Sequence, residues 1–296
     1  MKIDEYVVWT AIITPLLNDS SVDYESLEKL LRAQAAAGNG ITILGSTGEA
    51  LNLDDKERKE ILDFALGLKL DVPFMVGVGG ININEQKAWV EYLNNIDGLD
   101  AYLLVVPPYA KPGIHGQHQW FKALMDLAKR PCVLYNVPGR TCKKLEFESV
   151  KMLVDHPKFW AIKEASGSLE DFKKFVEIAP KAHMLSGEDG MLPEQCKLGC
   201  AGVVSVVSNV WPEAAHEWAK QSVAGKLNEP QVWLDAADAI FSATSPIPAK
   251  ALLHDLGRIK TPTLRLPLSI DDMSDVNALI KANQEVESWY AKQPNN

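Results

Sequence analysis

The sequence predicts an α/β protein, a (β/α)8 TIM barrel with a small C-terminal helical domain. Two observations carry this prediction. Short apolar runs rich in β-branched residues recur about every 30 residues, and amphipathic segments lie between them. The apolar residues within each run are continuous rather than alternating, which is typical of strands buried on both faces of a parallel sheet.

Eight such runs are predicted to be the strands, in chain order. They are residues 7–14, 41–44, 74–78, 102–106, 132–136, 159–163, 183–186 and 202–207. Amphipathic segments between and after them are predicted to be helices, among them 24–37, 55–70, 85–95, 117–129, 169–178 and 212–223. Eight strand–helix units in about 225 residues are typical of the barrel fold.

Several predicted helices carry start signals. Asp54 followed three residues later by Glu57 fits a capping box, and Asp23 and Ser168 are suitable N-cap residues. A doubly wound sheet is the alternative architecture, but it usually has a glycine-rich nucleotide loop after its first strand. Residues 13–16, Ile-Thr-Pro-Leu, contain no such loop.

The rhythm of strands stops at about residue 227. Helices are predicted there over residues 232–241, 249–256 and 273–290, with proline-rich stretches between them. We therefore divide the chain into a catalytic barrel, residues 1–226, and a helical appendage, residues 227–296.

Composition and charge narrow the functional classes. The 296 residues are 47% hydrophobic and 23% charged, with a net charge of -9, and no Lys/Arg cluster indicates a nucleic-acid partner. No apolar run is long enough to span a membrane, and the start of the chain lacks the features of a signal peptide. Four cysteines are too few for a disulfide scaffold, so we expect a reduced, cytoplasmic protein.

The sequence predicts neither a cofactor nor a metal ion. Cys196 and Cys200 are spaced i, i+4 on a predicted helix, but no Cys/His pair completes a zinc site. His115 and His118 share a predicted helix face, where histidine is more often a surface residue than a ligand. The glycines of residues 77–80 do not have the spacing of a dinucleotide loop.

The residue that most strongly indicates chemistry is Lys163, at the end of an apolar run. A buried ammonium must be paired or lose its proton, and a desolvated amine is a nucleophile for carbonyl carbons. Tyr135 ends another apolar run, so both side chains can meet at one rim of the barrel. The pair suggests covalent amine catalysis with a phenol that carries protons. A structural Lys–Glu pair is the alternative interpretation of Lys163.

Two loops that follow predicted strands could bind carboxylates. In residues 45–49, Gly-Ser-Thr-Gly-Glu, backbone N–H groups and the hydroxyls of Ser46 and Thr47 can grip such a group. Arg140, in a Pro-Gly-Arg loop, suits bidentate binding. The alternatives are an ordinary capped turn for the first loop and a surface arginine for the second.

Several motifs together resemble the dihydrodipicolinate synthase / N-acetylneuraminate lyase family. They are the Gly-Ser-Thr-Gly-Glu loop, Tyr135-Asn-Val-Pro-Gly-Arg-Thr, Ile162-Lys163-Glu-Ala-Ser-Gly, Ser186-Gly187-Glu-Asp and Gly202-Val-Val-Ser. They stand in the order and spacing of that family, and the similarity extends from about residue 8 to residue 267.

The resemblance implies a Schiff-base enzyme that acts on pyruvate without a cofactor. Lys163 would condense with the ketone, Ser46 and Thr47 would hold its carboxylate, and Tyr135 would transfer protons. Ser46 and Tyr109 would complete a hydroxyl relay with Tyr135, and that Tyr109 would come from the neighbouring subunit of a homotetramer, a dimer of dimers. The resemblance also implies that Gly187 and Val204 contact substrate.

Arg140 favours the synthase branch, in which an arginine binds the carboxylate of L-aspartate 4-semialdehyde. The expected reaction is then condensation of pyruvate with that aldehyde to 4-hydroxy-tetrahydrodipicolinate, for lysine and diaminopimelate synthesis. Other pyruvate aldolases, for sialic acid or 2-oxo-3-deoxy sugar acids, are the runner-up, and a catalytically silent binding paralogue is more remote. Pro108 and Ile81 stand where the family's lysine-effector pocket has a tyrosine and an asparagine, so we expect weak inhibition by lysine.

Overall fold

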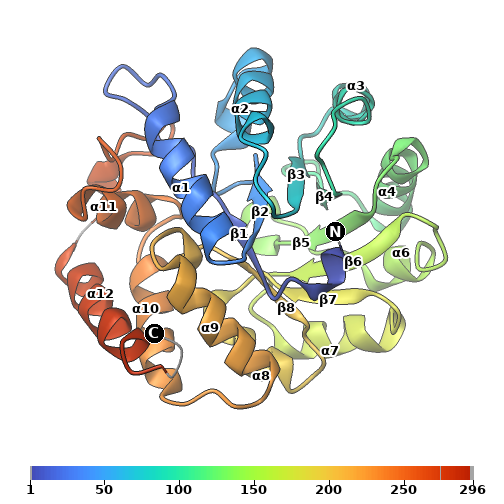
Figure 1. Ribbon diagram of the computed structural model, residues 1–296. Helices are drawn as coiled ribbons and strands as arrows, with labels where there is room; N and C mark the ends of the chain where they lie inside the picture. The colour runs from blue at the N-terminus through green and yellow to red at the C-terminus, as the bar shows by residue number, and fades with distance from the viewer. Residues whose placement is uncertain (1, 274, 294–296) are drawn as a thin grey trace.

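The computed structural model describes residues 2–273 and 275–293, and its centre is a closed barrel of parallel strands in the order β1 to β8. Each strand pairs with its chain neighbours, and β1 pairs with β8. The strands are β1 (Val8–Ala11), β2 (Gly40–Ile43), β3 (Phe74–Val78), β4 (Ala101–Val105), β5 (Cys132–Asn136), β6 (Phe159–Glu164), β7 (His183–Ser186) and β8 (Gly202–Ser205). The predicted TIM barrel is confirmed (Figure 1).

Helices surround the barrel, and further helices follow the barrel in the sequence, toward the C-terminus of the chain. They are α1 (Tyr24–Ala36), α2 (Asp55–Gly67), α3 (Ile83–Leu93), α4 (Ile114–Leu127), α5 (Pro138–Thr141), α6 (Phe147–Lys151), α7 (Leu169–Ile178), α8 (Leu192–Cys196), α9 (Pro212–Val223), α10 (Pro230–Ile240), α11 (Ile247–Asp255) and α12 (Asn277–Tyr290). Short 3-10 turns are η1 (Ile3–Glu5), η2 (Ala50–Asn52), η3 (Asp189–Met191), η4 (Val207–Asn209) and η5 (Ile270–Asp272). Within the described residues no helix is both long enough and apolar enough to cross a membrane.

The predicted N-caps are confirmed. The Asp23 and Ser168 side chains accept from backbone N–H groups in the first turns of α1 and α7. Asp54 and Glu57 form the complete capping box of α2.

Two strands are shorter than their apolar runs predict, because side chains take over their hydrogen bonds. The N–H of Ile13 donates to Oδ1 of Asn209 at 3.0 Å, so the chain leaves the sheet soon after Ala11. The N–H of Val206 donates to Oδ2 of Asp189 at 2.8 Å, which ends β8 at Ser205.

Other boundaries also differ from the predictions. The short helices α5 and α6 were not predicted, since four or five residues give too little periodicity for detection. The helix predicted to hold both Cys196 and Cys200 ends at Cys196, because Gly199 takes a left-handed φ of 99°. The helix predicted from residue 273 begins at Asn277, and residue 274 lies outside the described residues.

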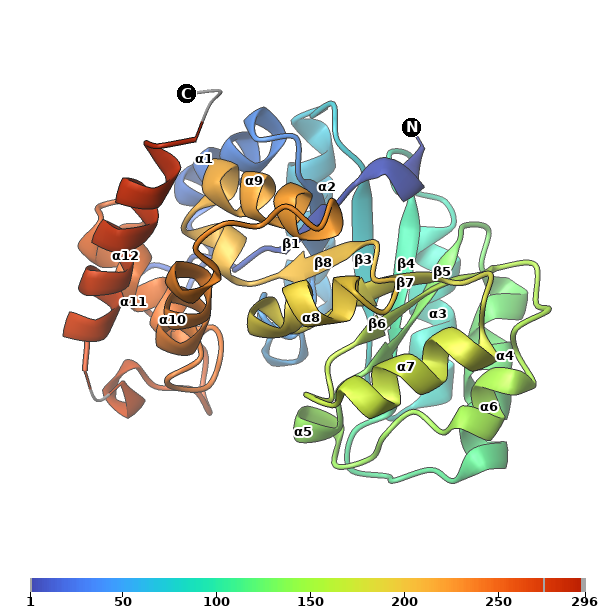
Figure 2. The same ribbon diagram turned by 90° about the horizontal axis from the view of Figure 1, so that it is seen from below.

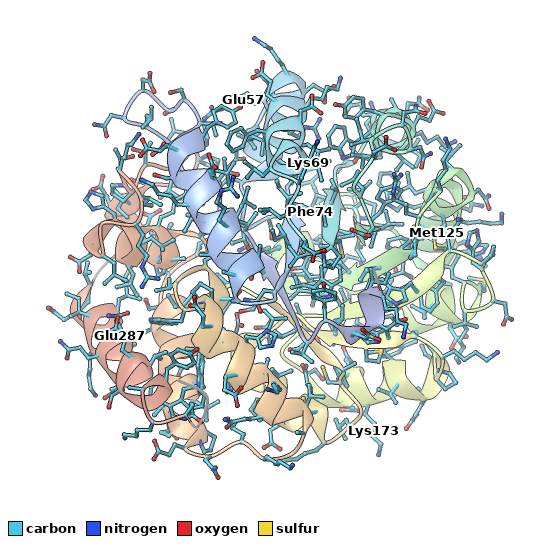
Figure 3. All side chains as sticks on the ribbon, viewed as in Figure 1. Glu57, Lys69, Phe74, Met125, Lys173 and Glu287 are labelled. Carbon is cyan, nitrogen blue, oxygen red and sulfur yellow. The ribbon has the colours of Figure 1, made fainter. Side chains whose placement is uncertain are left out.

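Two apolar cores hold the fold together. One fills the barrel interior and includes Trp9, Met75, Leu103 and Leu185, and the larger one lies between the barrel and its helices. Figure 3 shows the outer layer, where Lys173 and Glu287 project from the surfaces of α7 and α12. This arrangement buries both faces of every strand, as the continuous apolar runs predict.

Aromatic rings close the amino-terminal end of the barrel. Trp9 packs over Gly40, where an added Cβ would lie 2.8 Å from the indole, and its ring meets Trp160 edge-on. Trp160 in turn stacks on His183 with the ring centroids 5.5 Å apart. These rings fill this end, and two cavities lie at the opposite rim, where the strands end.

The helices after residue 227 pack at one side of the barrel (Figure 2). Trp233 on α10 stacks on Trp218 of α9, with centroids 4.7 Å apart, and meets Trp211 and Trp289 edge-on. Trp211, Trp218 and Trp233 are all buried. The division into two domains at residue 226 stays a prediction.

Candidate active site

Lys163 and Tyr135 lie side by side near the carboxyl ends of β6 and β5. The two residues are register partners, and Nζ of Lys163 lies 4.1 Å from the centroid of the Tyr135 ring. Lys163 is 5% exposed and Tyr135 is 7% exposed. Among the described residues no carboxylate forms an ion pair with Lys163, so the structural Lys–Glu alternative is not what the chain adopts.

The carboxylate next to Lys163 has other partners. Glu164 accepts from Nδ2 of Asn136 at 2.6 Å and from the N–H of Ser166 at 2.7 Å. Burial raises the pKa of Glu164, while these hydrogen bonds oppose the shift. Asn136 follows Tyr135 in β5, so this contact fixes the two strand ends that carry the tyrosine and the lysine.

Gly187, just after β7, leaves room for the lysine. A Cβ at this position would lie 2.9 Å from Cε of Lys163 and 2.5 Å from Cβ of Ala165. Gly187 also lines a cavity beside the amine. Gly187 therefore lies at the site, and a side chain at this position would displace Lys163.

The loop of residues 45–49, which follows β2, presents unused hydrogen-bond donors. The N–H groups of Ser46 and Thr47 have no acceptor within the described part of the chain, whereas those of Gly48 and Glu49 bond back to Gly45 and Ser46. Ser46 and Thr47 line both cavities at the rim. Two adjacent free N–H groups with two hydroxyls form a suitable site for a carboxylate.

Arg140 lies at the same rim on α5, which proline starts at Pro138. Its Nη2 donates to the carbonyl oxygen of Ser245 at 3.0 Å, and the side chain lines both cavities. The arginine is thus held toward the cavities by the segment that precedes α11.

The two cavities have volumes of about 250 Å³ and 500 Å³, and they share six residues. The shared residues are Ser46, Thr47, Tyr135, Val137, Arg140 and Lys163. The second cavity extends toward Thr244 and Phe241 of the C-terminal segment. One mouth therefore holds most of the residues that the sequence singled out.

Two acidic residues after β7 were not assigned roles from the sequence. Burial raises the pKa of Glu188, with Asp189 adding to the shift and Lys163 opposing it. Asp189 is fully buried and fixes the chain after β8 through the N–H groups of Val206 and Val207, at 2.8 and 3.3 Å. Consecutive acids directly after a strand are the sequence signal that could have identified them.

Two predicted site residues do not line these cavities. Tyr109 is 88% exposed, with a left-handed φ of 65°, on the loop after β4. Val204 lies on β8 among the buried residues of the barrel interior. Their assigned roles stay predictions.

The described residues contain no cluster of three or more His, Cys, Asp or Glu side chains suited to a metal ion. All four cysteines are free. At the rim, the buried amine of Lys163 lies beside the phenol of Tyr135, and the N–H groups of Ser46 and Thr47 are hydrogen-bond donors for a carboxylate. This set suits a small 2-oxo acid, whose ketone would meet the amine while the N–H groups hold its carboxylate.

Comparison with known proteins gives a consistent result. The profile of the dihydrodipicolinate synthetase family matches residues 6–284. A 4-hydroxy-tetrahydrodipicolinate synthase from Francisella philomiragia is 46% identical, covering 96% of this chain and 97% of its own. The corresponding enzyme of Wolbachia pipientis from Culex pipiens is 41% identical, over 95% and 96%.

Solved structures also resemble this chain. Dihydrodipicolinate synthase from Thermotoga maritima superposes with a TM-score of 0.89 at 30% identity, covering 95% of this chain and 98% of its own. The Acinetobacter baumannii enzyme, solved in complex with pyruvate, gives a TM-score of 0.88 at 30% identity, over 96% and 99%.

The space at Gly187 leads to a first prediction. Gly187→Ala should slow borohydride trapping of a small 2-oxo acid on Lys163 by about a hundredfold, because the new methyl group displaces Cε from its position. Trapping would be measured by mass spectrometry of the intact protein. Gly190→Ala is the matched control, since its Cβ would meet nothing closer than 3.5 Å. Equal trapping by both variants would contradict the prediction.

Proposed function

This chain belongs to the dihydrodipicolinate synthetase family, and we propose that it condenses pyruvate with L-aspartate 4-semialdehyde through an imine on Lys163. The product is 4-hydroxy-tetrahydrodipicolinate, on the route to lysine and diaminopimelate, and the enzyme is a lyase. The observation that carries the proposal is the buried Lys163 amine against Tyr135, beside the free N–H groups of Ser46 and Thr47.

Imine formation uses Lys163 as nucleophile. Its neutral amine attacks the ketone carbon of pyruvate to form a carbinolamine, and the hydroxyl of this intermediate must leave as water. Departure needs a proton, which the Tyr135 phenol can give and later regain. Because the covalent bond to Lys163 activates pyruvate, the proposed reaction uses no cofactor.

The carboxylate of pyruvate would lie against the loop after β2. The N–H groups of Ser46 and Thr47 would bind it, with their hydroxyls as further donors. Hydrogen bonds from such donors to a charged acceptor are stronger than those between neutral groups. This orientation would bring the ketone carbon to the amine of Lys163, which lines the same cavity.

Carbon–carbon bond formation follows from the imine. Loss of a methyl proton gives an enamine, whose carbon attacks the aldehyde carbon of aspartate semialdehyde. The amino group of the second substrate then displaces Lys163 from the imine carbon, which frees the enzyme and closes the ring. Overall, one pyruvate and one semialdehyde give one product and one water.

Arg140 is proposed to bind the carboxylate of the second substrate. Its guanidinium lies at the mouth shared by both cavities, and Ser245 holds one of its nitrogen atoms. Gly187 lines the same cavity, and we keep Gly187 and Val204 as proposed substrate contacts. An arginine here explains why a substrate that carries its own carboxylate would be selected.

We also propose a homotetrameric assembly, a dimer of dimers, in the cytoplasm. Leu51, Ile81 and Tyr109 are 63%, 59% and 88% exposed on the loops after β2, β3 and β4. Exposed apolar side chains on three neighbouring loops of the rim support contact with a second copy. Tyr109 would then complete the proton relay of Tyr135 and Ser46 in that copy.

The four free cysteines support the proposed location in the cytoplasm, which is a reducing compartment.

Trapping of the imine tests the proposed chemistry. Borohydride with pyruvate should add one pyruvate-derived group to the peptide that contains Lys163. Lys163→Arg should abolish the adduct, because a guanidinium does not lose its proton at working pH. Lys122→Arg, on the exposed face of α4, is the control and should trap normally. An adduct on another lysine would refute the assignment.

The role of Arg140 predicts an effect on one substrate only. Arg140→Ala should raise KM for aspartate semialdehyde about tenfold or more, since loss of a charge-assisted hydrogen bond typically costs about 1.5–3 kcal/mol. The KM for pyruvate should change little in steady-state assays. Lys144→Ala removes an exposed positive charge from the same stretch of chain, outside the two cavities, and serves as control. Equal increases for both substrates in Arg140→Ala would show that the arginine does not discriminate between them.

The shared relay predicts a link between assembly and turnover. Tyr109→Phe should lower kcat because the phenol hydroxyl is lost, while the oligomer measured by analytical ultracentrifugation stays intact. The aromatic ring, which makes the apolar contact, remains in this variant. A wild-type protein that is monomeric and fully active would disprove the relay between copies.

A further inference from the structure

A buried ion pair joins Glu49, the last residue of the loop of residues 45–49, to Lys250. Nζ of Lys250 is 2.5 Å from Oε1 of Glu49, and the two side chains are 0% and 1% exposed. Lys250 belongs to α11, about 200 residues further along the chain. The pair is outside the cavities, so it is no part of the chemistry described above.

Glu49 is the last residue of the loop that presents the free N–H groups of Ser46 and Thr47. It has a left-handed φ of 56°, and its own N–H donates to the carbonyl oxygen of Ser46 at 3.1 Å. A left-handed conformation is unfavourable for a residue with a side chain. The surroundings must therefore hold Glu49 in place.

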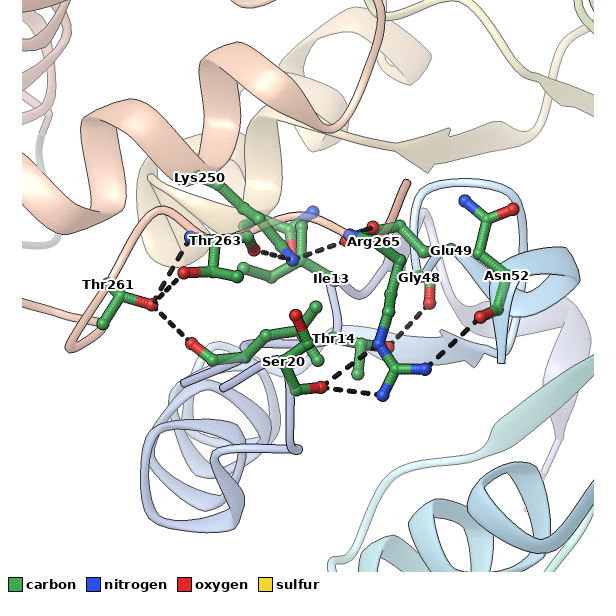
Figure 4. A network of polar contacts seen from close by, with 12 residues as sticks. Ile13, Thr14, Ser20, Gly48, Glu49, Asn52, Lys250, Thr261, Thr263 and Arg265 are labelled. Carbon is green, nitrogen blue, oxygen red and sulfur yellow. Dashed lines mark hydrogen bonds and ion pairs between the residues drawn. The ribbon is translucent and has the colours of Figure 1, made fainter. Parts of the chain in front are cut away.

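Both carboxylate oxygens of Glu49 are used. Oε1 accepts from Lys250, and Oε2 accepts from the N–H of Arg265 at 2.7 Å. Lys250 also donates to the carbonyl oxygen of Thr263 at 2.8 Å (Figure 4). The ion pair thus ties the end of the loop to two points of the C-terminal segment, α11 and residues 263–265.

The loop is fixed from its other side as well. The Thr14 hydroxyl donates to the carbonyl oxygen of Gly48 at 2.7 Å, and a Cβ on Gly48 would lie 3.0 Å from the carbonyl oxygen of Ile12. The Arg265 guanidinium contacts Glu57 and the carbonyl oxygen of Ser20. The loop has little freedom to move as long as Glu49 keeps its partners.

Stability alone gives a weak reason for this pair. Burial lowers the pKa of Lys250, and the adjacent Glu49 carboxylate opposes that shift. Removing two charges from water is costly, and well-packed apolar residues often stabilise a protein as much or more. A defined geometry is the best-supported benefit of such a pair.

We propose that Glu49 and Lys250 are positioning residues that hold the N–H groups of Ser46 and Thr47 in the geometry that binds the carboxylate of pyruvate. They act through the loop and touch no substrate themselves. The inference rests on the proposed function, because it takes pyruvate as the ligand of the loop. It predicts a defect in pyruvate binding rather than in imine chemistry.

The test is a titration of pyruvate in the borohydride trapping reaction, read by intact mass. Lys250→Met should raise the half-saturating pyruvate concentration by about tenfold, since a small misplacement of binding groups has large effects. The kcat at saturating pyruvate and the KM for aspartate semialdehyde should change far less. Glu49→Gln, which keeps an oxygen acceptor, should give a smaller shift in the same direction.

Arg130→Met is the matched control. Arg130 is a part-buried cation that donates to the carbonyl oxygens of Leu93, Ile96 and Leu99, before the start of β5 and away from the loop. Its loss should lower the melting temperature without changing the pyruvate titration. This control separates positioning from general destabilisation.

The outcomes are distinct. A folded Lys250→Met protein with an unchanged pyruvate titration overturns the inference, and so does a shift of the same size in Arg130→Met. If Lys250→Met does not fold, the Glu49→Gln titration decides by the same criterion. A wild-type protein that traps no pyruvate would refute the proposed function itself, and the inference with it.

Discussion

Closure of a parallel barrel is the constraint on which the rest of this structure depends. Since all strands run in one direction, their carboxyl ends meet at one rim, and residues far apart in the sequence become neighbours there. Tyr135 and Lys163 are separated by a helical connection, yet they are register partners on adjacent strands. The aromatic rings of Trp9 and Trp160 fill the opposite end, and the cavity beside Lys163 lies at this rim.

The rim carries many buried polar groups, and each must find a partner without occupying the reactive ones. Glu164 is satisfied by Asn136 and Ser166, and Asp189 accepts from the chain after β8. These pairings keep the nearby carboxylates from forming an ion pair with Lys163, whose amine faces Tyr135 instead. An unpaired amine is costly to bury, but it is what attack on a ketone needs.

Much of the barrel could be predicted from the sequence, because buried parallel strands are continuous apolar runs. All eight strands were located, and the capping signals at Asp23, Asp54 and Ser168 marked the starts of three helices correctly. The ends of β1 and β8 were not predictable, since Asn209 and Asp189 terminate them through contacts between distant segments. Short helices such as α6 have too few turns to show a period.

The site was predictable to the extent that its residues directly follow strands. Lys163 and Tyr135 lie near the ends of their strands, and Ser46, Thr47 and Arg140 follow strands, so all five line the same cavities.

What the sequence concealed is the contribution of the C-terminal segment, whose Ser245 carbonyl holds Arg140 and whose Lys250 holds Glu49. Neither contact has a local sequence signature, because in each contact the two residues are more than 100 positions apart in the sequence. One segment thus contacts both loops proposed to bind carboxylates, so packing of α10 to α12 against the barrel and geometry at the rim are physically linked. The four-tryptophan cluster formed by Trp211, Trp218, Trp233 and Trp289 anchors that packing by burying apolar surface between α9, α10 and α12.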